Sequence, residues 1–212
     1  MSAPARSATE NDLVIGRQAI FDRDGRIAAY ELLFRGSHDH GYARIANHDE
    51  ATHQVILNTF HDSALDDIVE GLPAFLNVSA GFLTGTYPLD HLLDAGHVVL
   101  EILESVSIDA HVIAGARALA RKGFRLALDD FVYDASYAPL LDVVDIIKID
   151  VKALPAASVA AHVEMLREHD LLLVAEKIES RSVHARCRDI GFHLFQGFHL
   201  ARPETITRWR PS

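Results

Sequence analysis

Three segments decide the fold: RLALDD at Arg125–Asp130, DIIKID at Asp145–Asp150 and LLLVAE at Leu171–Glu176. Each segment is a short apolar run, rich in Leu, Ile and Val, that leads into a charged side chain. Runs this short and this apolar are typical of strands that are buried on both faces of a parallel sheet. Helical patterns separate them, so this part of the chain predicts repeated strand–helix units.

The same alternation extends over most of the chain. Further strands are predicted at Ala74–Ser79, Val98–Leu103 and Phe192–Gln196. The helices between strands are predicted to begin at the capping residues Asp109, Ser158 and Ser182. A (β/α)8 barrel closes such a series, and 212 residues is near the lower end of its usual range. A doubly wound open sheet is the alternative, although no glycine-rich dinucleotide-binding turn supports it.

The beginning of the chain departs from this pattern. Leu13–Phe21 and Arg26–Arg35 both resemble strands, and Asp24-Gly25 between them is a strong signal for a two-residue hairpin turn. The first two strands are therefore predicted to be antiparallel. Met1–Asp12 is polar and is predicted to be a flexible segment that precedes a single domain over residues 13–212.

Composition excludes several classes of protein. Hydrophobic residues make up 49% of the chain and charged residues 24%, which is ordinary for a globular domain. The formal net charge of −10 argues against binding nucleic acid through a basic surface. The single cysteine, Cys187, permits no intrachain disulfide, and no apolar run approaches the roughly 20 residues that span a bilayer. A soluble, cytoplasmic protein is therefore predicted.

Polar side chains end most of the predicted strands. They are Glu31, Asn77, Glu101, Asp129 with Asp130, Lys148, Glu176 and Gln196. An ionised carboxylate at the end of an apolar strand is costly unless it is paired or bound to a metal ion. Barrel active sites are built at the carboxyl ends of the strands, where these side chains would converge. Carboxylates and amides that converge there predict a site for a hard divalent cation with oxygen ligands.

The sequences around these positions resemble the signature blocks of a known family. In order they are Tyr30-Glu31-Leu32-Leu33-Phe34-Arg35, Asn77-Val78-Ser79, Glu101-Ile102-Leu103-Glu104, Asp129-Asp130-Phe131, Lys148-Ile149-Asp150, Ala175-Glu176-Lys177-Ile178-Glu179 and Gln196-Gly197-Phe198. The family is that of EAL domains, which are bacterial cyclic di-GMP phosphodiesterases. The resemblance extends from about Val14 to Pro203. It implies an α/β fold that is a modified (β/α)8 TIM-like barrel with an antiparallel first strand.

The resemblance also implies a role for each matched residue. The metal ligands would be Glu31, Asn77, Glu101, Asp129 and Asp130, which with Glu176 would hold two Mg²⁺ or Mn²⁺ ions. The catalytic residues would be Lys148, which orients or deprotonates the attacking water, together with Glu176 and Glu104. The substrate side would comprise Arg35, Asp150, Gln196 and Glu179. Two such ions activate a water and stabilise the charge of an in-line displacement, which here would give the linear dinucleotide pGpG.

One block departs from the family pattern. After Asp-Asp-Phe, active members usually continue Gly-Thr-Gly-Tyr-Ser-Ser, whereas Val132–Tyr137 has the sequence VYDASY. In the family this loop positions the second metal ion and contributes to the dimer interface. Val132 and Asp134 are expected to resist backbone angles that glycine permits, which would impair turnover more than metal binding.

Two functions are consistent with these residues. The matched ligands favour metal-dependent hydrolysis of cyclic di-GMP, and the altered loop favours a catalytically inactive cyclic di-GMP receptor or protein-interaction module. The resemblance also implies a homodimer. The short segment after Arg35 and the Glu-Leu-Leu variant resemble the subgroup in which an EAL domain precedes an HDOD domain. The expected partners are therefore cyclic di-GMP, a second copy, and either another protein or a C-terminal HDOD domain; no nucleic-acid polymer and no membrane is expected.

Overall fold

The computed structural model describes residues 13–34, 64–88 and 93–208. Met1–Asp12 and Arg35 lie outside this part of the chain. The described elements are β1 (Leu13–Phe21), β2 (Ile27–Phe34), α2 (Ala64–Val69), β3 (Ala74–Val78), α3 (Ala80–Leu83), β4 (Val98–Ile102), α4 (Ala110–Arg121), β5 (Arg125–Leu128), the 3₁₀ helix η2 (Ala135–Tyr137), α5 (Ala138–Leu141), β6 (Ile146–Asp150), α6 (Ala156–Leu166), β7 (Leu172–Glu176), α7 (Arg181–Ile190), β8 (Leu194–Phe195) and β9 (Glu204–Arg208).

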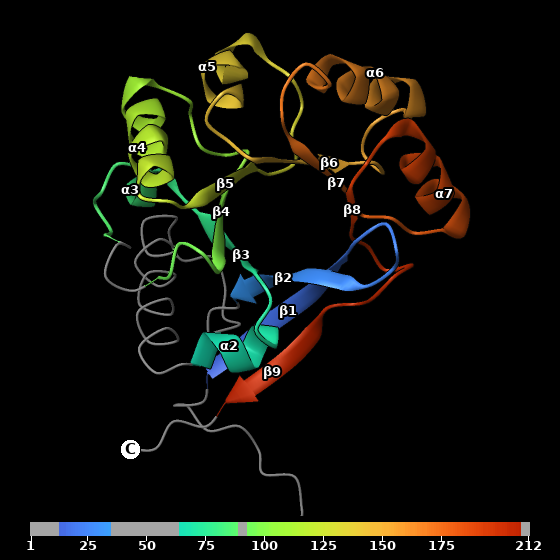
Figure 1. Ribbon diagram of the computed structural model, residues 1–212, viewed down its shortest axis with the longest axis horizontal. Helices are drawn as coiled ribbons and strands as arrows, with labels where there is room; N and C mark the ends of the chain where they lie inside the picture. The colour runs from blue at the N-terminus through green and yellow to red at the C-terminus, as the bar shows by residue number, and fades with distance from the viewer. Residues whose placement is uncertain (1–12, 35–63, 89–92, 209–212) are drawn as a thin grey trace, which may run out of the picture.

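Strands β1 to β8 form a closed ring (Figure 1). Strands β2 to β8 follow one another in chain order, and each is parallel to the next. Strand β1 closes the ring between β8 and β2 and is antiparallel to both. The predicted modified (β/α)8 barrel with an antiparallel first strand is thus confirmed, and closure through β1 excludes the open doubly wound sheet.

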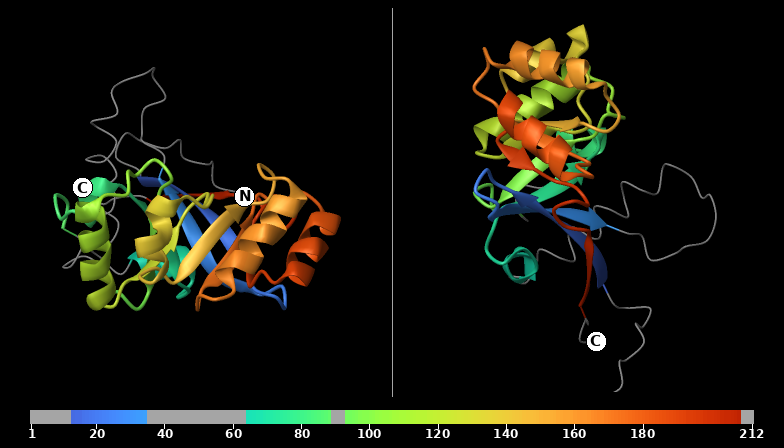
Figure 2. Two further views of the ribbon diagram at one scale, coloured as in Figure 1. Left: turned by 90° about the horizontal axis from the view of Figure 1, so that it is seen from above. Right: turned by 90° about the vertical axis from the view of Figure 1, so that its right-hand side faces the viewer.

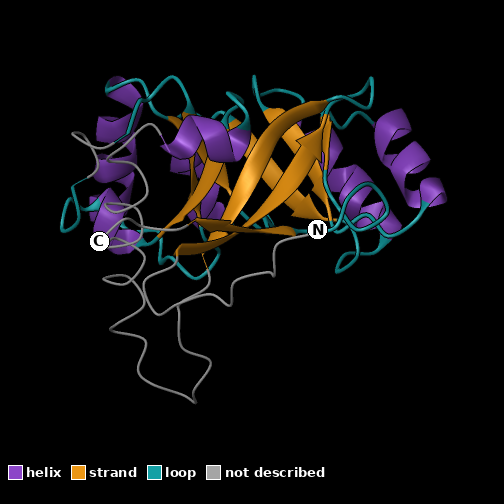
Figure 3. Cartoon of the chain, turned by 90° about the horizontal axis from the view of Figure 1, so that it is seen from below, coloured by secondary structure: helices purple, strands orange, loops and turns teal. Residues whose placement is uncertain are grey.

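The helices lie outside the ring (Figures 1 and 2). Viewed from below, helices flank the strands on either side (Figure 3). Apolar side chains of the strands, such as Leu100 and Ile147, share one buried cluster with helical residues such as Val112 and Val163. This outer core explains the nearly continuous apolar runs of the strands, since both of their faces are covered. No helix among the described residues is both long and apolar enough to cross a membrane.

A smaller apolar cluster fills the inside of the ring. It consists of Ile20, Ala29, Phe75, Val99, Ala127, Ile146 and Val174, with Leu194 packed against it. Residues two positions apart on a strand share a face, so the residue two positions from each cluster member, toward the carboxyl ends of the parallel strands, also points into the ring. These residues form the next layer. In every case that residue is polar: Gln18, Glu31, Asn77, Glu101, Asp129, Lys148, Glu176 and Gln196. We call these eight residues the polar layer; it lies at the carboxyl ends of the parallel strands.

The connection between β1 and β2 differs from the prediction. The strands are joined by the five residues 22–26 and not by a two-residue turn at Asp24-Gly25. Asp22 Oδ1 accepts hydrogen bonds from the backbone N–H of Asp24 and of Arg26, both at 2.8 Å. Gly25 has φ 78°, so the Asp-Gly pair makes its turn inside a longer loop. The pairing shifts register at Ile20/Phe21, which a tight turn cannot accommodate.

Two of the three predicted helix starts are also wrong. Asp109 caps α4 as predicted, accepting from the N–H of His111 and of Val112. Helix α7 is capped by Ser180 and not by Ser182, because Ser180 is the residue whose hydroxyl accepts from Val183 N–H. Helix α6 begins directly after Pro155, whose fixed φ suits a helix start, so Ser158 lies in the first turn.

Strand β9 was not predicted. It pairs antiparallel with the first half of β1, from Leu13 to Arg17, whereas β8 reaches β1 only at Phe21. A nine-residue strand beside a two-residue strand leaves most of one edge unpaired, and β9 covers that edge. Arg17 on β1 binds Glu204 of β9 at 3.2 Å, which fixes the pairing on the outer face.

Candidate metal centre

Lys148 on β6 lies at the centre of the polar layer. Its Nζ is 2.6 Å from Glu101 Oε1, 2.9 Å from Glu176 Oε1, 3.0 Å from Asp129 Oδ1 and 3.7 Å from Glu31 Oε2. Lys148 and Glu101 are fully buried, and Glu31 and Glu176 are nearly so. Adjacent strands of the barrel therefore bring four carboxylates to one ammonium group.

This buried centre carries more negative charge than its lysine neutralises. With all four carboxylates ionised, as a bound cation would require, their charge and that of the one ammonium would sum to −3. Burial, together with the neighbouring carboxylates, raises the pKa of Glu101 well above its usual value. Burial likewise raises the pKa of Glu176 to about 8. For Lys148 burial lowers the pKa, but the carboxylates, Glu101 first, outweigh it and raise the pKa well above the usual value.

Five buried oxygen atoms of the polar layer accept no hydrogen bond from the described residues. They are Asn77 Oδ1, Glu101 Oε1 and Oε2, Glu176 Oε2 and Gln196 Oε1. The contact from Lys148 to Glu101 is an ion pair that lacks hydrogen-bond alignment. Buried polar atoms in native proteins are rarely left without a partner. Carboxylate and amide oxygens are the ligands that hard divalent cations prefer, so these residues fit a divalent metal ion.

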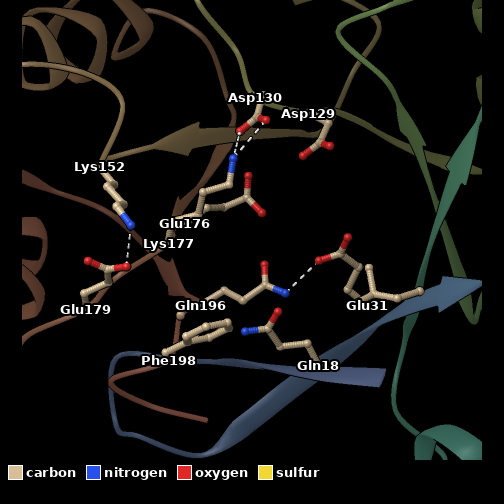
Figure 4. Close-up of a pocket in the computed structure, with 12 residues that line it drawn as sticks. Gln18, Glu31, Asp129, Asp130, Lys152, Glu176, Lys177, Glu179, Gln196 and Phe198 are labelled. Atoms are coloured by element: carbon tan, nitrogen blue, oxygen red, sulfur yellow. Dashed lines mark hydrogen bonds and ion pairs between the residues drawn. The ribbon is translucent and has the colours of Figure 1, made fainter. Parts of the chain in front are cut away.

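A second acidic group lies at the outer rim of the layer. Oxygens of Glu104, Asp129 and Asp130 lie within 4.8 Å of one another, so this group shares Asp129 with the buried centre. Asp130 is bound by Lys177, whose Nζ donates to both carboxylate oxygens at 2.9 and 3.0 Å (Figure 4). Lys177 Nζ also lies 2.7 Å from Asp150 Oδ2.

A cavity of about 380 Å³ opens over the polar layer (Figure 4). It is lined by Gln18, Glu31, Leu33, Asp129, Asp130, Lys152, Glu176, Lys177, Glu179, Gln196, Gly197 and Phe198. Gln196 Nε2 donates to Glu31 Oε2 at 2.7 Å on its floor, and Lys152 pairs with Glu179 at 2.6 Å on its wall. A cavity of this size is in the range of small-molecule sites.

The structure brings most of the predicted site residues together. Seven of them belong to the polar layer, all buried except the half-buried Asn77 and Asp129: Glu31, Asn77, Glu101, Asp129, Lys148, Glu176 and Gln196. Asp130, Asp150, Glu104 and Glu179 surround this layer at the rim. Asp150 is already engaged, since its Oδ1 accepts from the N–H of Lys152 and of Ala153 while its Oδ2 binds Lys177.

Sequence reasoning missed several residues that line the cavity. Gln18 lies opposite Glu31 in the β1–β2 pairing, but it precedes the interior residue Ile20 because β1 runs the other way. Gln18 therefore does not follow an apolar strand, which is the sequence pattern that the other residues of the polar layer share. Lys177 directly follows Glu176 in a quoted block, yet only the structure shows that it turns back to Asp130. Phe198 is 54% exposed at the mouth of the cavity.

The loop after Phe131 takes a conformation that does not require glycine. Asp134 has φ −133°, and neither it nor Val132 is among the left-handed non-glycine residues of the described chain, which are Glu70, Asp130 and Lys177. Asp134 Oδ1 accepts from Ser136 N–H at 2.9 Å and starts the short η2 helix. Val132 and Asp134 thus avoid the left-handed backbone angles that glycine permits, and the effect of this loop on turnover stays a prediction.

Gly197 fixes the backbone beside the cavity. Its φ is 150°, and a Cβ added to it would lie 2.2 Å from the backbone N of Ile178 and 2.3 Å from its O. Ile178 N–H donates to Gln196 O at 3.0 Å, so the segment after β7 packs directly on the segment after β8. Only glycine permits this approach.

Gly197→Ala is therefore expected to destabilise the protein by at least about 2 kcal/mol, because the methyl group meets backbone atoms and not a movable side chain. Urea unfolding measures the change. Gly25→Ala is a matched control: Gly25 also has a positive φ, but an added Cβ there meets nothing within 4 Å. Equal losses in the two variants would contradict the close-packing argument.

The EAL domain family model matches residues 77–203, which is more than half of the chain. The chain belongs to the EAL domain family. Two curated relatives each cover 91% of this EAL protein. YuxH of Bacillus subtilis, an uncharacterized protein, is 29% identical over 198 residues, and the cyclic di-GMP phosphodiesterase CdgJ of Vibrio cholerae is 28% identical over 194 residues. The chain spans 48% and 44% of their lengths, about half of each.

Solved EAL structures share the fold. The Bacillus subtilis YkuI protein, in complex with its substrate cyclic di-GMP and calcium, matches with a TM-score of 0.73 and 24% identity, over 92% of this chain and 56% of that one. Klebsiella pneumoniae BlrP1, in a manganese and cyclic di-GMP complex, matches with a TM-score of 0.74 and 23% identity over 96% and 58%. The EAL domain of Mycobacterium smegmatis DcpA matches with a TM-score of 0.69 and 26% identity over 90% and 92%.

Proposed function

We propose that this EAL protein binds cyclic di-GMP together with Mg²⁺ or Mn²⁺ in the cavity over the polar layer and hydrolyses it to pGpG. The observation that carries the proposal is the buried centre around Lys148, in which carboxylate and amide oxygens accept no hydrogen bond from the described residues. Its residue types are those that a metal-dependent phosphodiesterase needs. The curated relative CdgJ, a cyclic di-GMP phosphodiesterase, supports the choice of substrate.

The proposed metal ligands are Glu31, Asn77, Glu101 and Asp129 at the buried centre, together with Asp130, which the family resemblance assigns to a second ion. When bound, a divalent ion supplies a Lewis acid for the phosphodiester and lowers the pKa of a water. Four of the five side chains belong to the polar layer, whereas Asp130 lies at the rim. The family resemblance implies two ions, and the contacts of Asp130 bear on the second.

The proposed catalytic residues surround the buried centre. Three carboxylates within 3.0 Å hold the charge of Lys148, so its ammonium acts by orienting the attacking water and not as a base. Glu176 and Glu104 hold the groups around that water in place. Attack of one water on phosphorus would break one P–O bond of the ring and give pGpG. One proton of the water would reach the leaving ribose oxygen through a carboxylate or solvent, and the other would stay on the new phosphate or pass to solvent.

The proposed substrate contacts lie on the wall of the cavity. Gln196 Oε1 accepts no hydrogen bond from the described residues and can accept one from a guanine N–H. Glu179 and Asp150 lie beside the opening, where Lys152 and Lys177 hold them in place. Arg35, outside the described residues, remains a sequence-based prediction for a contact to a substrate phosphate.

Arg35→Ala is expected to weaken binding of cyclic di-GMP by roughly 10-fold or more, because a hydrogen bond between charged groups contributes about 1.5–3 kcal/mol. Titration calorimetry in Ca²⁺, with Arg121→Ala on the outer helix α4 as the control, measures the difference. Equal affinities of the Arg35 variant and the parent would exclude the contact.

The decisive experiment is incubation of the protein with cyclic di-GMP and Mn²⁺, followed by chromatographic analysis of the products. Formation of pGpG, absent in EDTA and absent without protein, is expected. Tight binding of the nucleotide without any pGpG after many hours would instead identify a receptor.

A receptor without turnover is the second candidate function. The altered loop Val132–Tyr137 favours it, because this loop lacks the glycines of active members. Its Val132 and Tyr133 are 52% and 43% exposed, which also suits the homodimer interface that we propose there. We further propose that residues 13–212 act as one domain in the cytoplasm, alone or with a C-terminal HDOD domain or another protein partner.

A further inference from the structure

Two acidic centres lie side by side above the barrel, and they differ in how their oxygens are used. The buried centre comprises Glu31, Glu101, Asp129 and Glu176 around Lys148. We call Asp130 and Asp150 the rim centre. Asp129 connects the two, because its oxygen also lies within 4.8 Å of oxygens of Asp130 and Glu104, in an arrangement suited to a second cation.

Every oxygen of the rim centre already has a partner. Both oxygens of Asp130 accept from Lys177 Nζ, at 2.9 and 3.0 Å. Asp150 Oδ2 lies 2.7 Å from the same Nζ, and Asp150 Oδ1 accepts from two backbone N–H groups. One ammonium group therefore bridges two carboxylates, in the way that a metal ion would.

The backbone is shaped to deliver this ammonium group. Asp130 follows β5, Asp150 ends β6 and Lys177 follows β7, so the three residues meet across neighbouring strands. Lys177 has φ 56° and Asp130 has φ 42°, a left-handed conformation that non-glycine residues rarely adopt. Figure 4 shows the Lys177 side chain directed at Asp130 over the cavity. Such a conformation persists only where surrounding contacts hold it, and the ion pairs provide those contacts.

We propose that the ammonium group of Lys177 is the second cation of this site, and that the chain therefore binds a single divalent ion, in the buried centre. The inference rests on the proposed metal-dependent function and changes the number of ions that it requires.

Charge arithmetic separates the two centres. With its four carboxylates ionised the buried centre would sum to −3, and it contains oxygens that accept no hydrogen bond from the described residues, so its lysine leaves room for a divalent ion. The rim centre, Asp130 and Asp150 with Lys177, sums to −1 and its oxygens are all paired. The exposed Glu104 beside it contributes one further carboxylate. A divalent ion at the rim would have to displace an ammonium group that is covalently part of the site. Asp130 then offers its charge to Lys177 and not to a metal ion.

The experiment counts bound ions and needs no turnover. Equilibrium dialysis against Mn²⁺ gives the number of ions per chain, and the Mn²⁺ electron paramagnetic resonance spectrum distinguishes an isolated ion from a spin-coupled pair. The variants are Lys177→Gly, which relieves the backbone and removes the cation, and Lys177→Met, which removes the cation alone. Lys152→Met is the matched control, because it removes another lysine that lines the cavity and pairs with Glu179.

The parent and Lys152→Met are expected to bind one isolated Mn²⁺, and both Lys177 variants to bind two that are coupled. Two ions in the parent would overturn the inference while leaving the proposed function intact. One ion in the Lys177 variants, with thermal unfolding unchanged, would also overturn it, because Lys177 would not be what limits binding. No bound ion in the parent would refute the metal-dependent function, and the inference with it.

Discussion

Lys148→Met is expected to lower hydrolysis of cyclic di-GMP by about 10²–10⁴-fold, the range typical of a residue that assists proton transfer or orients the attacking group. The same substitution should destabilise the metal-free protein. It leaves Glu101, which is fully buried, beside three other carboxylates without the cation that faces them. Breaking a buried ion pair by removing one partner costs about 3–5 kcal/mol.

Two measurements separate these effects. Thermal unfolding in EDTA reports the lost ion pairs, and unfolding in saturating Mn²⁺ should recover much of the loss, because a metal ion then supplies the missing charge. Lys152→Met is the control, since its ion pair with Glu179 is largely exposed and worth less than about 1 kcal/mol. A Lys148→Met protein with unchanged stability in EDTA would contradict the buried centre as described.

Glu101→Gln is expected to abolish most of the stabilisation that Mg²⁺ or Mn²⁺ gives the parent and to lower hydrolysis by at least about 100-fold. Glu101 is the fully buried carboxylate of the centre, and both of its oxygens lack a hydrogen bond from the described residues. The loss exceeds the 10–100-fold typical of residues that only support a metal ligand. In EDTA the Glu101→Gln protein should melt at a higher temperature than the parent, because a neutral amide reduces repulsion among the four carboxylates.

The check is a comparison of melting temperatures with EDTA and with Mn²⁺ for the parent, for Glu101→Gln and for Glu164→Gln. Glu164 pairs with Arg167 on the surface of α6 and is the control for loss of one negative charge. Only Glu101→Gln should lose the metal-induced rise. A parent whose melting temperature is unaffected by either metal would refute the assignment of this site.

The parallel part of the fold could be predicted from sequence, because strands buried on both faces leave a simple apolar pattern. Val98–Ile102, buried at every position, is an example. The connections could not be predicted as well. Ser180 and Ser182 are both competent caps two residues apart, and only packing decides between them. Strand β9 exists because β8 is too short to cover β1, a fact of tertiary pairing that its own sequence does not record.

The site shows the same division. Glu31, Glu101, Asp129, Lys148 and Glu176 could be predicted because each is polar where an apolar strand ends. Their convergence follows from barrel geometry alone. Gln18 could not be predicted because it belongs to the reversed strand β1, and Lys177 could not because its position depends on a left-handed backbone angle. The conformation of the loop after Phe131 could not be predicted either, because Asp134 takes an extended backbone conformation that does not require glycine.

The reversed strand β1 has a consequence for biosynthesis. Its edge opposite β2 pairs with β8 and β9, so the neighbours on that edge are the last strands to leave the ribosome. The contact between Arg17 and Glu204 spans 187 positions, and that between Glu31 and Gln196 spans 165. Contacts of such long range form slowly, and until they form β1 has an unpaired edge. This edge is exposed to aggregation while the chain is being made, and the cluster around Lys148 assembles only after Glu176 has been translated.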